Sequence, residues 1–84
     1  MDDELNVEEL IRKQWIFMNN GRLLSSRLIF NEDGSVSGYR NVNEARWRLD
    51  GDCLQFERES GHVTSRLEWD RDRQCFSGGS TISA

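Results

Sequence analysis

Apolar and polar residues alternate most regularly between Asn43 and Phe56. The apolar positions of this stretch are Ala45, Trp47, Leu49, Leu54 and Phe56. A period of two is typical of a strand with one buried face, and the Asp50-Gly51 pair between the two runs predicts a two-residue hairpin turn. This turn would place Trp47 opposite Leu54. We therefore expect a β-hairpin whose apolar face belongs to the core and around which the other strands are arranged.

A helical period precedes the strands. Its apolar positions, at i, i+3 and i+4, are Val7, Leu10 and Ile11. Asn6 is suited to the N-cap, and acidic residues in the first turn with basic residues in the last turn match the helix dipole. The pattern predicts a helix over residues 6–13, which needs to dock on the sheet because two turns are not stable alone in water. Residues 1–5 are expected to fray.

Two hairpins are expected before residue 40. Asn20-Gly21 is the preferred pair for a type I′ turn, and the run from Asn31 to Gly34 suits a three-residue loop with a bulge. The pairs that these turns would bring together on the inner face are Phe17 with Leu24, Trp15 with Ser26 and Phe30 with Val36. The second register is favoured because it keeps both apolar side chains inside.

The C-terminal half continues the alternation. Ser60-Gly61 and Arg71-Asp72 predict two further hairpin turns. The inner-face pairs expected from them are Phe56 with Ser65, Leu54 with Leu67 and Phe76 with Leu67. Gly78-Gly79-Ser80 is expected to end the sheet, so residues 80–84 are expected to fray.

Together these elements predict a mainly β fold. We expect an antiparallel meander of about seven short strands with one short N-terminal α-helix. A coiled sheet of this size closes either into a small barrel or into a half-barrel capped by the helix, and the pattern leaves both open. Residues 1–84 make one small domain, whose core draws its bulk from three Trp, four Phe and one Tyr.

The charge distribution narrows the classes of partner. The net charge is −4, and five of the fifteen acidic residues lie in residues 2–9. The rest of the chain has no basic stripe, which argues against nucleic acid because phosphate affinity comes largely from Lys and Arg. No apolar run approaches the roughly 20 residues of a membrane span, and the acidic start lacks the features of a signal peptide. We therefore expect a cytoplasmic protein that binds neither nucleic acid nor membrane.

The residues that usually carry catalysis or metal binding are few and separated. His62 is the only histidine and is expected to be exposed at a strand end. Cys53 and Cys75 form no CxxC motif, so neither a disulfide nor a zinc site is expected. Asp50 and Asp52 flank a turn glycine, where Asp is common because of turn geometry. The sequence therefore predicts no catalytic residue, metal or cofactor, and we expect the protein not to be an enzyme.

The candidate binding surface combines Arg, Tyr and Asn, residue types enriched where proteins recognise polar partners. Its members are Arg22, Ser25, Arg27, Tyr39, Arg40, Asn41, Asn43 and Glu44. In the expected register Ser25, Arg27 and Tyr39 face outward on adjacent strands, next to the loop that ends at Glu44. The alternative is that Arg27 stacks on Tyr39 merely to cover the sheet.

The order of the elements resembles that of a known fold. A short N-terminal helix leads into a first strand with Trp15, and only hairpins follow, among them the stretch FNEDGSVSGY. In this order the chain resembles a shortened up-and-down barrel of the lipocalin and avidin type. The resemblance implies the binding of a small apolar ligand inside the barrel.

Two classes of function follow. The first is a non-catalytic binding or interaction module that takes a protein partner or a small polar ligand on the candidate surface. The second is a small barrel that binds a ligand in an internal cavity, with or without catalysis. Its sequence hints are Ser26 and Ser65 on the inner face, and it needs a cavity of at least roughly 300 Å³. A homodimer is a third alternative, because an open sheet has two edges to protect.

Overall fold

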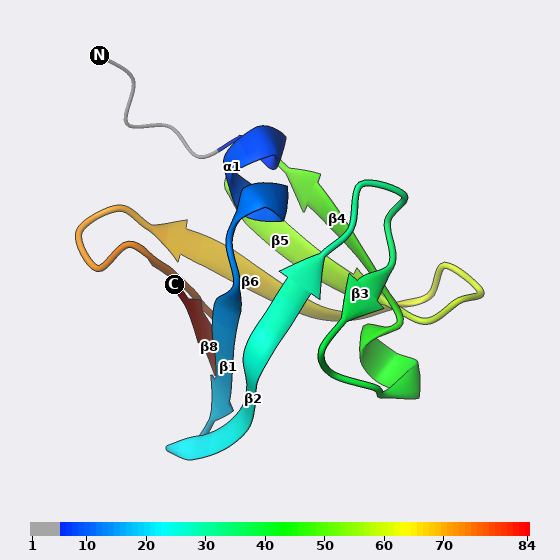
Figure 1. The fold of residues 1–84 in the computed structure, drawn as a ribbon, viewed down its shortest axis with the longest axis horizontal. Helices are drawn as coiled ribbons and strands as arrows, with labels where there is room; N and C mark the ends of the chain where they lie inside the picture. Colours follow the sequence, from blue (N-terminus) through cyan, green and yellow to red (C-terminus); the bar gives the residue numbers. More distant parts are fainter. Residues whose placement is uncertain (1–5) are drawn as a thin grey trace.

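The computed structural model describes residues 6–84, which form an eight-stranded sheet with a short helix (Figure 1). In chain order the elements are α1 (Val7–Arg12), β1 (Trp15–Asn19), β2 (Arg22–Phe30), β3 (Val36–Ser37), the 3₁₀ helix η1 (Val42–Glu44), β4 (Arg46–Asp50), β5 (Cys53–Glu57), β6 (Val63–Asp70), β7 (Cys75–Ser77) and β8 (Ser80–Ser83). The predicted fold class is confirmed, with eight strands rather than about seven. The expectation that residues 1–5 fray concerns residues outside the described range.

The strands lie in the order β3-β2-β1-β8-β7-β6-β5-β4, and neighbouring strands are antiparallel. This is an up-and-down meander whose first and last strands, β1 and β8, lie side by side. The edges of the sheet are β3 and β4, which meet at an isolated bridge between Ser35 and Arg46. The sheet is thus nearly closed into a barrel. Figure 1 shows α1 at one end, with η1 and the β1–β2 turn toward the other.

The last strand corrects the expected ending of the sheet. Residues 80–84 were expected to fray, but β8 pairs with β7 on one side and with β1 on the other. Ile82 is fully buried, opposite Phe17 in β1 and Phe76 in β7. The preceding Gly78-Gly79 pair makes a turn rather than an end. The reason is geometric, since without β8 the strands β1 and β7 would have unpaired edges above an exposed core.

Several predicted registers are confirmed. The confirmed inner pairs are Phe30 with Val36, Phe56 with Ser65 and Leu54 with Leu67. Asn20-Gly21 forms the predicted turn, with φ angles of 50° and 76°, as both central residues of a type I′ turn require. The β5–β6 turn has one residue more than predicted, because Arg58 donates its backbone N–H to the carbonyl of His62. A bulge after Phe56 restores the predicted register beyond the loop.

The central hairpin turns one residue later than predicted. The turn residues are Gly51-Asp52, and Trp47 lies opposite Phe56. The φ angle of 60° at Gly51 suits the first central position of a type II′ turn. In this register Leu49 lies opposite Leu54. The predicted register would have placed Leu49 opposite the polar residue Asp52. The better apolar match accounts for the shift.

Two bulges change the register of the first hairpin. Phe17 lies opposite Ser25 and Trp15 opposite Leu28, instead of their predicted partners. Each bulge adds a residue on β2, so the inward and outward positions exchange between the bulges and return afterwards. Ser25 is consequently buried and Ser26 exposed, the reverse of the prediction. The two serines are identical in polarity, so alternation along the sequence does not reveal the exchange.

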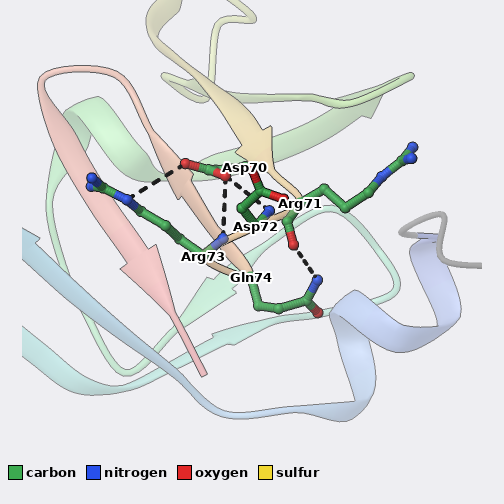
Figure 2. A network of polar contacts seen from close by, with 5 residues as sticks. All are labelled: Asp70, Arg71, Asp72, Arg73 and Gln74. Carbon is green, nitrogen blue, oxygen red and sulfur yellow. Dashed lines mark hydrogen bonds and ion pairs between the residues drawn. The ribbon is translucent and has the colours of Figure 1, made fainter.

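The charged turn between β6 and β7 has four residues, Arg71 to Gln74, rather than the predicted two (Figure 2). Phe76 therefore lies opposite Trp69, not opposite its predicted partner. The Asp70 carboxylate accepts hydrogen bonds from the backbone N–H groups two and three residues further on, at 3.0 and 3.2 Å. Gln74, whose φ is 55°, donates from Nε2 to the Arg71 carbonyl at 2.7 Å. Hydrogen bonds between the Asp70 and Gln74 side chains and the backbone therefore stabilise the conformation of this turn.

The core is formed by the inward apolar side chains of the strands together with Leu10 from α1. Its buried members are Leu10, Trp15, Phe17, Leu28, Phe30, Trp47, Leu54, Phe56, Leu67, Phe76 and Ile82. The helix forms as predicted, with the Asn6 side chain accepting a hydrogen bond from the backbone of Glu9 at 2.9 Å. Trp15 Nε1 donates to the Leu10 carbonyl at 2.9 Å. Docking of α1 therefore gives Trp15 Nε1 a hydrogen-bond acceptor and also buries the Leu10 side chain.

Candidate binding site

Two hollows adjoin the connection from β3 to β4. The larger, which we call the seam hollow, has a volume of about 1040 Å³ and is lined by residues 35–42, 44, 45 and 58–60. The smaller, which we call the end hollow, has a volume of about 540 Å³ and is lined by Phe17, Asn19, Asn20, Arg22, Leu24, Tyr39, Glu44, Ser65 and Ser80. Tyr39 and Glu44 line both hollows. These two side chains therefore stand where the hollows meet.

The seam hollow exists because β3 has only two residues. Gly38, which follows it, has a φ angle of +84°, and a Cβ at this position would overlap the carbonyl oxygen of Arg27. The chain thus passes close over β2 and then turns toward η1 instead of extending along β4. Beyond the bridge between Ser35 and Arg46, β3 and β4 are not paired. The space left between the two edges is the seam hollow.

Tyr39 faces the core and not the outer surface. Its half-buried ring meets the ring of Phe17 edge to face, with 5.2 Å between the ring centroids. The predicted outward pairing of Tyr39 with Arg27 is therefore wrong. Gly38 is the physical reason, since its left-handed backbone interrupts the alternation that the prediction extended to Tyr39.

Ser25 is a structural residue of the bulged strand. Its buried hydroxyl donates to the Gly38 carbonyl at 2.7 Å and accepts from the backbone N–H of Arg27 at 3.1 Å. Both hydrogen bonds fix the position of Gly38 against β2. Ser25 was expected to face outward at a binding surface, and the structure instead places it beneath that surface. The Arg27 side chain is exposed and lines neither hollow.

The two asparagines of the connection hold η1 in place. Asn41 is its N-cap and accepts a hydrogen bond from the backbone of Asn43 at 2.9 Å. Asn43 accepts from Arg58 Nε through its side chain at 3.1 Å and from the Thr64 hydroxyl through its carbonyl. These contacts tie η1 to the β5–β6 hairpin. Asn41 lines the seam hollow, and Asn43 lines neither hollow.

Glu44 has the most distinctive environment of the predicted residues. Its Oε2 is buried and has no hydrogen-bond partner among residues 6–84. Burial raises the pKa of the Glu44 carboxyl above its ordinary value of 4.5, since removal from water disfavours the charged form. Trp69 Nε1 is also buried without a partner, but Trp69 lines neither hollow. Glu44 thus combines an unpaired buried oxygen with a position on the wall of both hollows.

The structure brings five of the eight predicted residues to the two hollows. They are Arg22, Tyr39, Arg40, Asn41 and Glu44. Sequence analysis missed Asn19 and Ser80, which line the end hollow and are joined by a hydrogen bond of 2.8 Å from Asn19 Nδ2 to Ser80 Oγ. This contact was not predicted, because the sheet was expected to end at Ser80 and no strand was expected beside Asn19. Ser65, predicted to face inward, does line the end hollow.

Comparison of the chain with protein-family models, with curated proteins and with solved structures finds no match. The likeness to lipocalin and avidin barrels is therefore limited to the nearly closed up-and-down arrangement of strands. Within residues 6–84, no group of three or more His, Cys, Asp or Glu side chains is placed to hold a metal ion. Of the helices described, none has the length and hydrophobicity to cross a bilayer.

Proposed function

We propose that this chain is a non-catalytic binding module that takes a small polar ligand at the junction of the two hollows, with a hydrogen-bond donor of the ligand placed at Glu44. The observation that carries the proposal is the buried and unpartnered Glu44 Oε2. A buried acceptor without a partner typically costs about 1–3 kcal/mol. A ligand that donates to this oxygen removes that cost in the complex, so the cost in the free protein favours binding.

The surroundings of Glu44 favour a flat cationic group as the donor. Tyr39 lines the same hollows, and Phe17 is a second aromatic residue in the lining of the end hollow. A guanidinium group can donate two parallel hydrogen bonds to a carboxylate and can stack on an aromatic face. The volume of the end hollow, about 540 Å³, lies within the range of ordinary small-molecule sites, and that of the seam hollow, about 1040 Å³, lies at its upper limit.

The location distinguishes this proposal from ligand binding in the centre of the barrel. The centre is filled by aromatic rings, with the Phe17 and Phe56 centroids 5.6 Å apart and the Phe30 and Phe56 centroids 6.0 Å apart. A ligand therefore has room at the rim of the barrel and not in its middle. A non-catalytic role is supported by the position of His62, which is exposed and lines neither hollow.

The experiment is an NMR titration of the ¹⁵N-labelled chain with L-arginine and with L-argininamide, which both carry a guanidinium group. We expect saturable shifts of the backbone amides from Tyr39 to Ala45 with at least one of the two compounds. Glu44→Gln should weaken that binding by at least about tenfold, because a neutral amide loses the charge-assisted bond. Glu68→Gln, on the exposed face of β6, is the matched control. If neither compound shifts these amides, the proposed function is wrong.

A further inference from the structure

The end hollow carries two opposite charges that do not neutralise each other. Arg22 and Glu44 both line it. Within the described part of the chain, the ion pairs join Arg48 with Glu57 at 3.7 Å and Arg73 with Asp70 at 3.9 Å. Neither Arg22 nor Glu44 belongs to these pairs. The hollow thus offers one free cation and one free anion, set apart from each other on its wall.

The two charges are held by different parts of the fold. Arg22 is the first residue of β2 and lies directly after the tight Asn20-Gly21 turn. Glu44 is the last residue of η1, which Asn41 caps and Asn43 ties to the β5–β6 hairpin. The two charges are therefore contributed by separate parts of the barrel, each of which has its own backbone contacts.

The wall between the charges is mixed in character. Phe17, Leu24 and Tyr39 supply apolar surface, and the amide of Asn19 is held in place by Ser80 Oγ at 2.8 Å. A ligand that carried only a positive group would meet Glu44 but would leave the Arg22 guanidinium to water. A ligand with an additional carboxylate would satisfy both.

We propose that the end hollow recognises a zwitterion of amino-acid size, with its cationic group at Glu44 and its carboxylate at Arg22. This inference rests on the proposed function and adds the second charge of the ligand. The volume of about 540 Å³ accommodates a molecule of that size within the ordinary range of ligand sites. Arg22 supplies a planar guanidinium that matches a carboxylate with two parallel hydrogen bonds.

The test compares L-arginine with L-argininamide, which differ in the α-carboxylate. Dissociation constants come from the same NMR titration, performed on the parent chain and on Arg22→Gln. On the parent we expect arginine to bind at least about tenfold more tightly than argininamide. Arg22→Gln should reduce the affinity for arginine to that for argininamide and leave argininamide binding unchanged. Arg66→Gln, an exposed position on β6, should alter neither.

The outcomes separate the two proposals. If the two compounds bind equally to the parent, or if Arg22→Gln weakens both by the same factor, the zwitterion inference is wrong and the proposed function stands. If neither binds, both fail. N-acetyl-L-arginine retains the guanidinium and the carboxylate. Because it keeps both recognised groups, it should bind about as tightly as arginine, and its failure beside bound arginine would contradict recognition through these two groups.

Discussion

The barrel closes in two places, and the two closures are built differently. Between β1 and β8 the backbones form a continuous ladder with paired positions from Ile16–Ser83 to Asn19–Ser80. Between β3 and β4 the backbones meet at one bridge, from Ser35 to Arg46, next to the hydrogen bond from the Trp47 N–H to the Gly34 carbonyl at 3.0 Å. We call the second closure the seam.

Much of the contact across the seam is made by side chains. Trp47 Nε1 donates to the Asn31 carbonyl at 2.8 Å, and its ring meets Phe30 edge to face at 5.4 Å. Arg46 Nη2 donates to the Asp33 carbonyl at 3.2 Å. A backbone ladder brings strands to about 4.8 Å from each other and leaves no room between them. A closure made by side chains at one point leaves open space beside it, which is where the seam hollow lies. The end hollow is instead lined in part by Asn19 and Ser80, the last pair of the β1–β8 ladder.

The largest effect is expected from removing the tryptophan of the seam. Trp47→Ala should lower the free energy of unfolding by about 3–5 kcal/mol, because it deletes a core ring together with its hydrogen bond across the seam. Urea denaturation followed by circular dichroism measures the loss. Trp47→Phe keeps an aromatic ring and should cost less than half as much. A Trp47→Ala chain that unfolds like the parent would show that this ring does not hold the seam.

The continuous closure is probed by Ile82→Ala. Ile82 is fully buried between β1 and β7, so we expect a loss of about 2–4 kcal/mol in the same urea assay. Thr81→Ala, at an exposed position of the same strand, serves as the control and should change stability by less than about 0.5 kcal/mol. Equal effects of the two variants would mean that β8 is not part of the folded core.

A smaller effect is expected from Gly38→Ala, where the chain leaves the sheet. The φ angle of +84° and the overlap of a Cβ with the Arg27 carbonyl predict a cost of about 2 kcal/mol. Gly21→Ala is the matched control, since Gly21 has a φ of +76° but no atom within 4 Å of its Cβ position. It should cost about 1 kcal/mol. Equal melting temperatures of the two variants would argue against the close passage over β2.

The smallest effect is expected at Glu44. Because burial raises the pKa of this carboxyl, the folded chain binds its proton more tightly than the unfolded chain does, and ionisation of Glu44 disfavours folding. Glu44→Gln should therefore raise the melting temperature slightly at pH 7, by about 2 °C or less. The gain should vanish at about pH 4, below the ordinary value of 4.5. A gain that is the same at both pH values would exclude this cause.

Alternation and turn chemistry were sufficient to predict most of the strands. They located the Asn20-Gly21 turn and the pairing of Leu54 with Leu67, because there each apolar residue has one suitable partner. They failed where a shift by one residue leaves polarity unchanged, as at Ser25 and Ser26. They also failed at β8, which carries Ile82 as its single large apolar residue after two glycines.

The candidate site was only partly predictable for the same reason. The residue types between Tyr39 and Glu44 indicated a polar site, and the Asn41-x-Asn43 spacing could have indicated the η1 cap. The position of Tyr39 depends on Gly38 and on the two bulges of β2, which are tertiary features. The seam hollow depends in turn on the short β3. No local pattern contains that information.

The β1–β8 ladder also sets an order of events in folding. Neighbours elsewhere in the sheet are consecutive in sequence, whereas this ladder joins residues such as Asn19 and Ser80, which are 61 positions apart. Closing so long a loop costs entropy before the new contacts repay it. The hairpins can therefore form first and the ladder last, so contacts of Ile82 should be largely absent from the transition state. Ile82→Ala would then act mainly on the unfolding rate, which stopped-flow kinetics can separate from the folding rate.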